Sequence, residues 1–350
     1  MMVSMTSGAM AVPAWEAMSE EQVGRWTELL DGVAGMLPSA TACVVVDGGP
    51  YAAVVADRLA GRLRTGGRAC TRVTGAIPAA AERTPGTVTL ADGAARRSRP
   101  PAGGWDVVIW LRAHRAPDGD AERNADIVID LHDVAWPVIR HVVRRLAGRS
   151  RWYVAESRAF FGPRAATWDT RFGDDMPAYS AAVADAEIPA GATALDAGCG
   201  TGRALPALRG AVGPSGTVIG MDITPQMLSV ARATGRARHA VLILADARRL
   251  PLADGEVDAV FAAGLIPHLP DPVAGLGGLA RVTRPGGRLV IFHPSGRAAL
   301  AARHGRTLSP DEPLAEGRLG ELLAATGWRL DTYDDPDHRF LALATRRRTA

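Results

Sequence analysis

The stretch "ALDAGCGTGRALPAL", residues 194–208, decides the fold of the larger part of this chain. An apolar run ends at Asp196, a glycine-rich turn follows, and a helical pattern comes after it. The turn contains Gly198, Gly200 and Gly202. Glycine permits positive φ and leaves no Cβ in the way of a ligand, and the first N–H groups of a helix are free to meet an anion. The stretch therefore predicts a strand, a ligand-binding turn and a helix.

The spacing of these glycines distinguishes two cofactor classes. A dinucleotide-binding turn has the pattern G-x-G-x-x-G, in which the third glycine allows close helix–strand packing. Arg203 occupies that third position here, and the pattern is instead G-x-G-x-G with an acid two residues before it. An NAD(P)-dependent oxidoreductase, which would bind NADH, is therefore the less favoured interpretation.

Strand-like and helix-like segments alternate regularly through the C-terminal half. The strand-like segments are "TALDAG", "TVIGMD", "AVLILAD", "VDAVFAA", "RLVIFH", "WRLDTYDD" and "FLALATRR". Five strand–helix units followed by two closely spaced strands predict a doubly wound parallel α/β sheet of seven strands, with an antiparallel last strand.

The N-terminal half has the pattern of a smaller α/β domain. Short apolar segments at residues 42–46, 87–92, 106–111 and 126–131 are typical of buried parallel strands, and helices are expected over 21–36 and 134–148. The predicted division of the chain is a flexible tail (1–20), this domain (21–150), a helical linker that caps the site (151–190) and the main domain (191–350).

Composition excludes several classes of protein. The net charge of +3 is too small and too scattered for a nucleic-acid partner. The chain has no lysine, so no lysine can act as a base or a phosphate clamp. Three cysteines make no disulfide framework, and neither a signal peptide nor a membrane-length apolar run is recognisable. The expectation is a soluble cytoplasmic protein that contacts neither nucleic acid nor membrane.

Three further segments accompany the glycine turn in a fixed order. "VIGMDIT" ends a strand at Asp222, "LADARRL" places Asp246 after the next strand, and "VFAAG" ends the fourth. The set resembles the class I S-adenosylmethionine-dependent methyltransferases over roughly residues 155–345. It is most similar to the small-molecule enzymes of the ubiquinone-biosynthesis kind (methyltransferase type 11).

This resemblance implies S-adenosylmethionine as cofactor and no metal. It implies that Asp222 accepts the ribose hydroxyls, that Asp246 faces the adenine amino group, and that carbonyls at the end of the fourth strand hold the methionine amine. The implied cofactor residues are Asp196, Gly198, Cys199, Gly200, Gly202, Asp222, Ile223, Asp246, Ala247, Ala262 and Ala263. Cys199 is a small residue of the turn in this interpretation, not a nucleophile.

The resemblance also indicates where the methyl acceptor binds. Two histidines, His268 and His293, follow predicted strands at the cleft edge, and each is either a general base or a residue that lines the pocket. The predicted cap contributes the aromatic residues Phe161, Trp168 and Tyr179, which either stack on an apolar or planar acceptor or pack the cap itself.

"VVVDGGPYAAVVADRL", residues 44–59, carries a weaker second resemblance, to uridine kinase-like P-loop proteins. The phosphate chemistry of a P-loop needs a Lys and a Ser or Thr, and this chain has Val54 and Val55 at those positions. Only 14 residues, 112–125, separate two of the predicted strands, too few for a kinase lid. Phosphoryl transfer is therefore not expected.

Three roles stay open for this degenerate domain. It is a scaffold that mediates packing or a homodimer, or it binds a nucleotide through backbone N–H groups at Gly48 and Gly49, or it shapes the acceptor site. For the whole chain we expect methyl transfer from S-adenosylmethionine to O, N or C of a small molecule, in specialised metabolism. The alternative is a regulatory protein that binds S-adenosylmethionine or a nucleotide without turnover.

Overall fold

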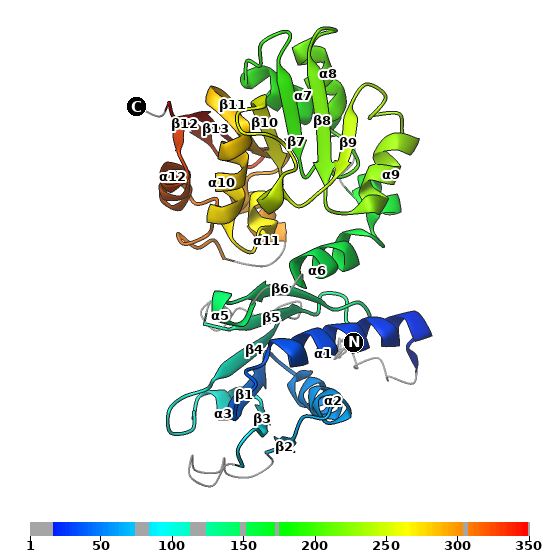
Figure 1. Ribbon diagram of the computed structural model, residues 1–350, viewed down its shortest axis with the longest axis vertical. Helices are drawn as coiled ribbons and strands as arrows, with labels where there is room; N and C mark the ends of the chain where they lie inside the picture. Colours follow the sequence, from blue (N-terminus) through cyan, green and yellow to red (C-terminus); the bar gives the residue numbers. More distant parts are fainter. Residues whose placement is uncertain are drawn as a thin grey trace, which may run out of the picture. The chain divides into compact units, whose positions relative to one another are not determined.

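The computed structural model describes residues 17–73, 84–112, 124–147, 152–171, 175–303 and 307–348 of the chain. The chain forms two compact units that divide between Trp152 and Tyr153. Figure 1 shows the N-terminal unit in blue to green and the C-terminal unit in green to red. Residues 1–16 of the predicted tail and most of the short segment 112–125 lie outside the described residues.

The N-terminal unit is built on a six-stranded sheet in the order β2-β3-β1-β4-β5-β6. Its strands are β1 (Ala42–Asp47), β2 (Cys70–Arg72), β3 (Val88–Asp92), β4 (Val107–Arg112), β5 (Ile127–Asp130) and β6 (Val138–Val142). All neighbouring pairs are parallel except β5–β6. Every residue of the central strand β1 is buried, which explains why the sequence shows an unbroken apolar run there.

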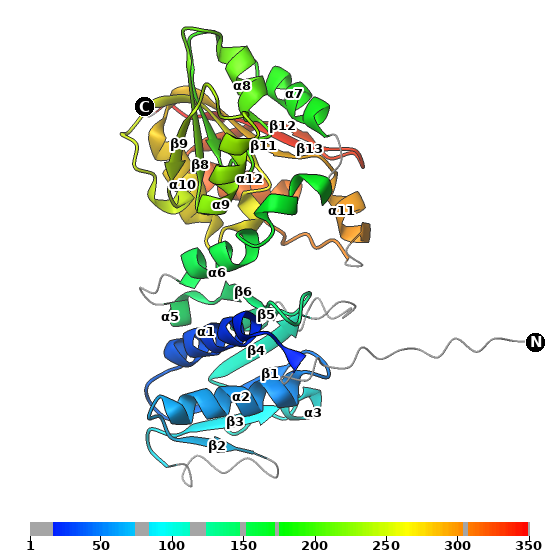
Figure 2. The same ribbon diagram turned by 90° about the vertical axis from the view of Figure 1, so that its right-hand side faces the viewer.

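Two long helices cover one face of this sheet, and Figure 2 shows them side by side. The helices of the unit are α1 (Glu20–Met36), α2 (Ala52–Thr65), α3 (Ala94–Arg97) and α5 (Arg144–Ala147). A capping box of Ser19 and Gln22 begins α1, since each side chain satisfies a backbone N–H that the helix leaves free. The apolar faces of α1 and α2 share one core with alternate residues of the central strands.

The prediction of a helix over residues 134–148 is wrong. Residues Val138–Val142 form β6, which pairs antiparallel with β5, and only the four residues of α5 are helical before residue 148. Pro137 disfavours helical backbone in the residue before it, and the β-branched residues that follow fit a pleated, half-buried surface. Arg140 adds an ion pair across the strands, 3.0 Å from Asp130.

The C-terminal unit has a seven-stranded sheet in the order β12-β13-β11-β10-β7-β8-β9. Its strands are β7 (Thr193–Ala197), β8 (Thr217–Asp222), β9 (Val241–Leu244), β10 (Val257–Ala263), β11 (Thr283–His293), β12 (Trp328–Asp334) and β13 (Phe340–Arg346). The first five are parallel, and β13 runs antiparallel to both of its neighbours. The predicted doubly wound sheet with an antiparallel last strand is confirmed.

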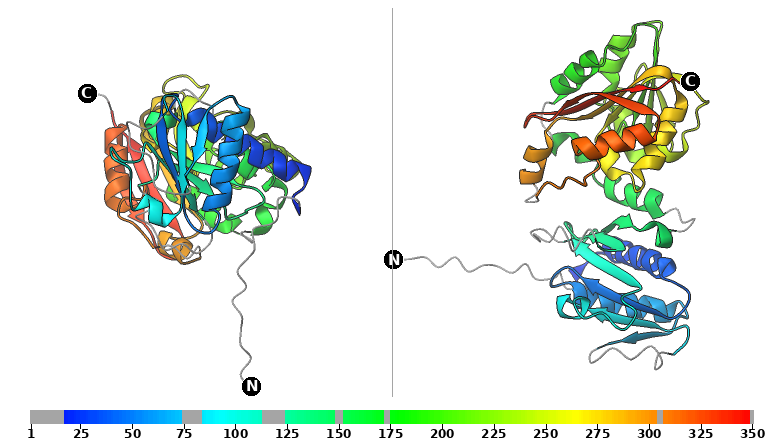
Figure 3. Two further views of the ribbon diagram at one scale, coloured as in Figure 1. Left: turned by 90° about the horizontal axis from the view of Figure 1, so that it is seen from below. Right: turned by 90° about the vertical axis from the view of Figure 1, so that its left-hand side faces the viewer.

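Helices pack on both faces of this sheet. The helices of the unit are α6 (Trp152–Phe161), α7 (Met176–Asp185), α8 (Leu205–Val212), α9 (Pro225–Ala233), α10 (Pro272–Val282), α11 (Arg297–Arg303) and α12 (Glu316–Ala325), with the 3₁₀ turns η3 (Ala165–Thr167), η4 (Asp169–Arg171), η5 (Ala247–Arg249) and η6 (Ile266–His268). Residues of α7, α8 and α9 share a core with the sheet, and α10 contacts α12. Figure 3 shows α12 beside β12. This layering leaves the carboxyl ends of the parallel strands at one edge.

Candidate functional site

The carboxyl ends of β7, β8 and β10 bring the predicted cofactor residues together. These parallel strands are neighbours, with Asp196 opposite both Gly220 of β8 and Phe261 of β10. In open α/β sheets, ligands bind beyond the carboxyl ends where the strand order reverses. Here the strand order reverses at β7, with β8 on one side and β10 on the other. The glycine turn that follows β7 is therefore placed at the position where this fold binds ligands.

The three glycines of the turn have different tasks, although all have positive φ. A Cβ on Gly202 would lie 2.9 Å from Leu205 and 3.1 Å from Ala231, so this glycine is needed for packing. Gly200 has φ +52°, and a Cβ there would meet no atom within 4 Å. Gly200 therefore borders open space, and it is the glycine of this turn that a ligand can approach most closely.

Asp196 is almost completely buried, with 1% of its surface exposed. Within the described residues its Oδ2 atom has no hydrogen-bond partner. Burial, together with the nearby charge of Asp222, raises the pKa of this carboxyl group to about 8. A buried carboxyl group of this kind stays largely protonated near neutral pH unless a cation stabilises its ionised form. The site therefore fits a ligand with a positively charged group, such as the ammonium group of S-adenosylmethionine.

Asp222 ends β8 as a buried carboxylate held by backbone donors. Its Oδ2 accepts a hydrogen bond from the Gly200 N–H at 2.9 Å, and its Oδ1 accepts one from the Thr224 N–H at 2.7 Å. Burial raises the pKa of this group, and these N–H donors act against the increase. Each carboxylate oxygen can accept more than one hydrogen bond. Asp222 can therefore hold the glycine turn in place and still accept two ribose hydroxyls.

Asp246 lies next to Asp222, because the residue before it donates its N–H to the Asp222 carbonyl at 3.0 Å. Ala247 follows and is buried. Both Asp246 oxygens already accept hydrogen bonds from Arg248, at 2.6 to 3.1 Å. The sequence pattern does not indicate this pair, since an arginine two residues after an acid is usually a surface residue.

Cys199 is buried in the turn, and its N–H donates to the Met221 carbonyl at 2.9 Å. Burial, with the charges of Asp196 and Asp222, raises the pKa of the thiol well above its usual range. A thiol with a raised pKa carries little of the reactive thiolate form at neutral pH. The geometry thus favours a packing role for Cys199.

The predicted cap aromatics separate into two groups. The ring of Phe161 contacts Trp168 at 5.4 Å and His268 at 5.2 Å. Tyr179 instead packs on Phe292 of β11, at 5.0 Å between ring centres, and is half-buried beside the core of the sheet. Phe161 and Trp168 are therefore placed with His268, whereas Tyr179 contributes to the packing of α7.

The two candidate bases differ in their surroundings. His268 lies in η6 directly after β10 and is exposed, with its ring against Phe161. His293 ends β11, and its Nδ1 atom lies 3.1 Å from the Ser295 N–H and 2.9 Å from the Ser295 carbonyl oxygen. One nitrogen of His293 is thus engaged locally, whichever tautomer is present. Ile223, Ala262 and Ala263 lie at the ends of β8 and β10, as predicted.

An ionic cluster that sequence analysis missed ties the glycine turn to the segment before α7. Thr201 donates to Asp169 at 2.6 Å, Arg236 donates to Asp169 at 2.5 Å, and Arg203 pairs with Asp175. Burial alone would raise the pKa of Asp169, but the hydrogen bonds from Thr201 and Arg236 outweigh it and lower the pKa. The arginine directly after the glycines was the available signal, but its partners lie some 30 residues earlier.

The turn after β1 in the N-terminal unit is the second candidate. A Cβ on Gly48, which has φ +114°, would lie 2.1 Å from the Leu111 carbonyl oxygen of β4. Asp47, at the end of β1, lies 3.7 Å from the Arg97 guanidinium, which stacks over Trp110. The glycine that suggested a phosphate loop is therefore required by the packing of two strands.

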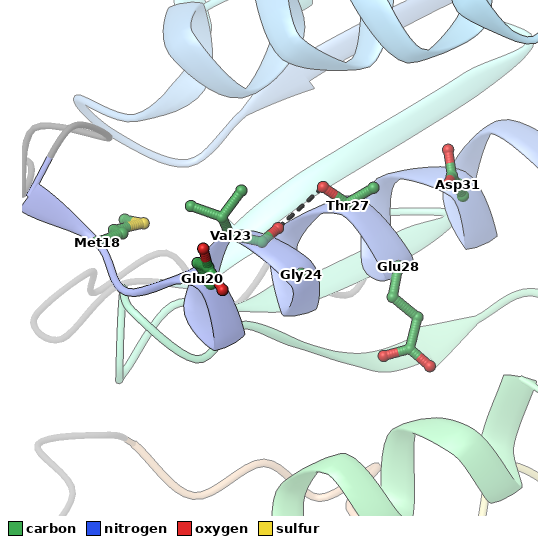
Figure 4. Close-up of a pocket in the computed structure, with 7 residues that line it drawn as sticks. All are labelled: Met18, Glu20, Val23, Gly24, Thr27, Glu28 and Asp31. Atoms are coloured by element: carbon green, nitrogen blue, oxygen red, sulfur yellow. Dashed lines mark hydrogen bonds between the residues drawn. The ribbon is translucent and has the colours of Figure 1, made fainter.

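A shallow depression of about 670 Å³ lies along α1 of the N-terminal unit, shown in Figure 4. It is lined by Met18, Glu20, Val23, Gly24, Thr27, Glu28 and Asp31. Two of its acids are already paired, Glu28 with Arg25 and Asp31 with Arg62. Apart from Met18, which precedes α1, the lining comes from this one helix.

The part of the chain that the structure describes lacks two further kinds of feature. No group of three or more His, Cys, Asp or Glu side chains is placed there to hold a metal ion. Among the described helices, none is both long enough and apolar enough to cross a membrane.

The fold and the site together define the C-terminal unit as a doubly wound domain for a nucleotide-like cofactor. Residues 195–291 match the family model of the methyltransferase domain. That match covers the glycine turn and the acids at the ends of β8 and β9, and the cofactor of this domain is S-adenosylmethionine.

Several known proteins resemble part of this chain. An uncharacterized 37.1 kDa protein in transposon TN4556 of Streptomyces fradiae is 36% identical over 156 residues, 44% of each chain. The demethylmenaquinone methyltransferase of Bacillus licheniformis is 38% identical over 109 residues, 31% of this chain and 47% of that one. The chain thus spans about half the length of these curated relatives.

Solved structures match about half of the chain. A SAM dependent methyltransferase from Aquifex aeolicus is 24% identical with a TM-score of 0.42, and the match covers 48% of this chain and 89% of that one. A protein of echinomycin biosynthesis is 29% identical with a TM-score of 0.41, and the match covers 49% of this chain and 82% of that one.

Proposed function

We propose that this protein transfers a methyl group from S-adenosylmethionine to a small-molecule acceptor. The observation that carries the proposal is the buried Asp196 carboxylate, whose Oδ2 atom lacks a partner among the described residues, beside the open face of Gly200. That arrangement accepts a cationic ligand at a glycine turn. The match of residues 195–291 to a methyltransferase domain supports the same assignment.

In this mechanism the cofactor supplies an activated methyl group on its sulfonium. Asp196 would hold the ammonium group, Asp222 the ribose hydroxyls, and Asp246 with the Ala247 N–H the adenine ring. Binding at several fixed points orients the methyl group, and orientation supplies much of the rate in such a transfer. The protein adds a surface that excludes water and positions the acceptor.

We propose that the acceptor lies against Phe161 and Trp168. The Phe161 ring contacts both Trp168 and His268, which follows β10, and two aromatic faces favour a planar or apolar molecule. His268 is the better placed of the two candidate bases, because its ring contacts Phe161. A base is required only for an acceptor that keeps its proton until the transfer. We also propose that the methyl group is transferred to an O, N or C atom of the acceptor, and that the protein acts in specialised metabolism.

To test the proposal, the protein is incubated with methyl-labelled S-adenosylmethionine and a small-molecule extract of the cells that contain the protein. The proposal expects a labelled small molecule and release of S-adenosylhomocysteine. Cofactor binding without any labelled product across such fractions would support the alternative, a regulatory protein that binds S-adenosylmethionine without turnover. Labelled protein or nucleic acid in place of a small molecule would contradict the proposed acceptor class.

For Asp222→Ala we expect S-adenosylmethionine binding to weaken by about 2 kcal/mol, roughly thirtyfold in Kd. The substitution removes the acceptor of the ribose hydroxyls and the support of the Gly200 N–H. Asp222→Asn keeps one acceptor oxygen and should lose less. Calorimetric titration of both variants measures the difference, and equal affinity of wild type and Asp222→Ala would remove this residue from the site.

The pKa of Asp196 predicts a proton release on binding. Its pKa of about 8 lies above the ordinary value of 3.8, so at pH 7 the carboxyl group is mostly protonated in the free protein. A bound ammonium group favours the ionised form, and about one proton should leave the site when the cofactor binds. Titration in two buffers of different ionisation enthalpy measures this number.

Asp196→Asn is the control, because an amide cannot ionise. We expect its proton release at pH 7 to be smaller by about one proton than that of the wild type. Above about pH 9, where Asp196 is already ionised, the two proteins should release similar numbers. Identical release at pH 7 would show that Asp196 does not meet the charge of the ligand.

For the N-terminal unit we propose a degenerate kinase-like scaffold without phosphoryl transfer. Val55 is buried in the core with α1 and β1, and Val54 packs against the same core, so the positions of the phosphate-binding residues serve packing. Mg²⁺-dependent ATP turnover by the purified protein would contradict this role. It stays a prediction that the protein forms a homodimer, that a nucleotide binds at Gly49, and that the protein is located in the cytoplasm.

A further inference from the structure

The Asp246 carboxylate, which the proposed function assigns to adenine, is fully engaged by a residue of its own turn. Its Oδ1 accepts from the Arg248 backbone N–H at 2.9 Å and from Nε at 3.1 Å. Its Oδ2 accepts from Nε at 3.1 Å and from Nη2 at 2.6 Å. An arginine fork on a carboxylate is among the stronger hydrogen-bond pairs of proteins, so Arg248 defines the surroundings of Asp246.

The same guanidinium group lies over an aromatic ring. The Arg248 Cζ atom is 4.3 Å from the centre of the Tyr153 ring, on α6. Tyr153 is 8% exposed. Burial, together with the negative charges of Asp246 and Asp222, raises its pKa to about 12, so its hydroxyl group is neutral at neutral pH. Tyr153 therefore lies beside the ion pair of Arg248 and Asp246.

In this position Arg248 makes the contacts that an adenine base would need. The guanidinium is planar, donates N–H groups in its plane to Asp246, and stacks on a ring through its face. An adenine offers the same features: a flat ring, with an amino group in the plane. Both groups cannot occupy the same face of Tyr153 and the same oxygens of Asp246 at once.

We propose that Arg248 occupies the adenine subsite, and that the cofactor binds by displacing its guanidinium from Asp246 and stacking its base on Tyr153. This inference rests on the proposed function, since it assumes a cofactor that carries adenine. The displaced side chain can move into water, because 26% of its surface is already exposed while it is paired with Asp246. Arg248 thus lowers the affinity of the protein for its cofactor and for the demethylated product.

The test is calorimetric titration of the full chain with S-adenosylhomocysteine and with adenosine. Arg248→Ala removes the competitor, and we expect roughly fivefold tighter binding of both ligands, because a partly exposed ion pair no longer has to be broken. Arg249→Ala is the matched control, since Arg249 lies in the same turn, is exposed and has no ion pair among those that the structure gives. It should leave both affinities unchanged.

Tyr153 gives a second, independent readout. Tyr153→Leu should weaken both ligands by roughly tenfold, because it loses the stacking surface, whereas Tyr153→Phe should bind like the wild type. Weaker or unchanged binding by Arg248→Ala would overturn the inference, as would wild-type affinity in a folded Tyr153→Leu. If the wild type binds neither ligand, the proposed function fails. If the wild type binds both ligands and the variants give these contrary results, only the inference about Arg248 fails.

Discussion

Gly200→Val is expected to abolish binding of S-adenosylmethionine while leaving the C-terminal unit folded. The Cβ of the new residue would point into the open space beside the glycine turn, where no protein atom lies within 4 Å. If the cofactor occupies that space, a branched side chain there excludes it. The backbone at φ +52° also resists a β-branched residue, so a modest loss of stability accompanies the loss of binding.

Gly213→Val separates these two effects. Gly213 follows α8, has φ +66°, and a Cβ at this position would also meet no atom within 4 Å. The substitution therefore carries similar backbone strain at a distance from the turn. We expect it to bind S-adenosylhomocysteine like the wild type and to lose a similar amount of stability. If both variants lose binding equally, backbone strain and not the cofactor explains the effect.

Gly48→Ala is expected to destabilise the N-terminal unit severely. Its Cβ would lie 2.1 Å from the Leu111 carbonyl oxygen and 2.6 Å from the Leu111 nitrogen. Backbone atoms in a central strand cannot move aside as a side chain can, and overpacking of this kind costs about 3 kcal/mol or more. Urea unfolding is followed with and without S-adenosylhomocysteine. The transition whose midpoint the ligand does not shift is assigned to this unit.

Gly49→Ala is the matched control for that experiment. Gly49 has φ +103°, and no atom lies within 4 Å of a Cβ there. Strain alone should cost about 1 kcal/mol. A loss as large as that of Gly48→Ala would show that the turn as a whole, and not the contact with β4, requires glycine. Equal and small losses would contradict the packing role of Gly48.

The grouping of the proposed cofactor residues at one edge of the sheet could be predicted from sequence because its signals are local. Asp196, Asp222 and Asp246 each follow an apolar strand, and parallel strands place their carboxyl ends at one edge. The glycines between strand and helix have few alternative explanations. Local pattern and topology therefore agree, and the predicted residues lie together in the structure.

The wrongly predicted helix and the position of Tyr179 both depend on distant parts of the chain. The segment 134–148 has a helical pattern by itself, and only pairing with β5 makes residues Val138–Val142 a strand. Tyr179 is close in sequence to the other cap aromatics, yet it packs on Phe292, more than a hundred residues away. No spacing in the sequence could indicate either contact.

The pairs around the site were missed for a different reason. Arg203 and Arg248 look like surface arginines in a chain that uses arginine for all its basic side chains apart from histidine. Their partners, Asp175 and Asp246, become evident only when the positions of the side chains are known. The one available signal was position, since both arginines directly follow predicted cofactor residues.

The proposed function depends on binding of S-adenosylmethionine at the glycine turn of the C-terminal unit. Calorimetric titration of the full chain with this compound tests it most directly. We expect one site per chain with a dissociation constant in the micromolar range, binding of S-adenosylhomocysteine at the same site, and loss of both in Gly200→Val. Absence of binding heat for both compounds, with NADH binding in their place, would contradict it.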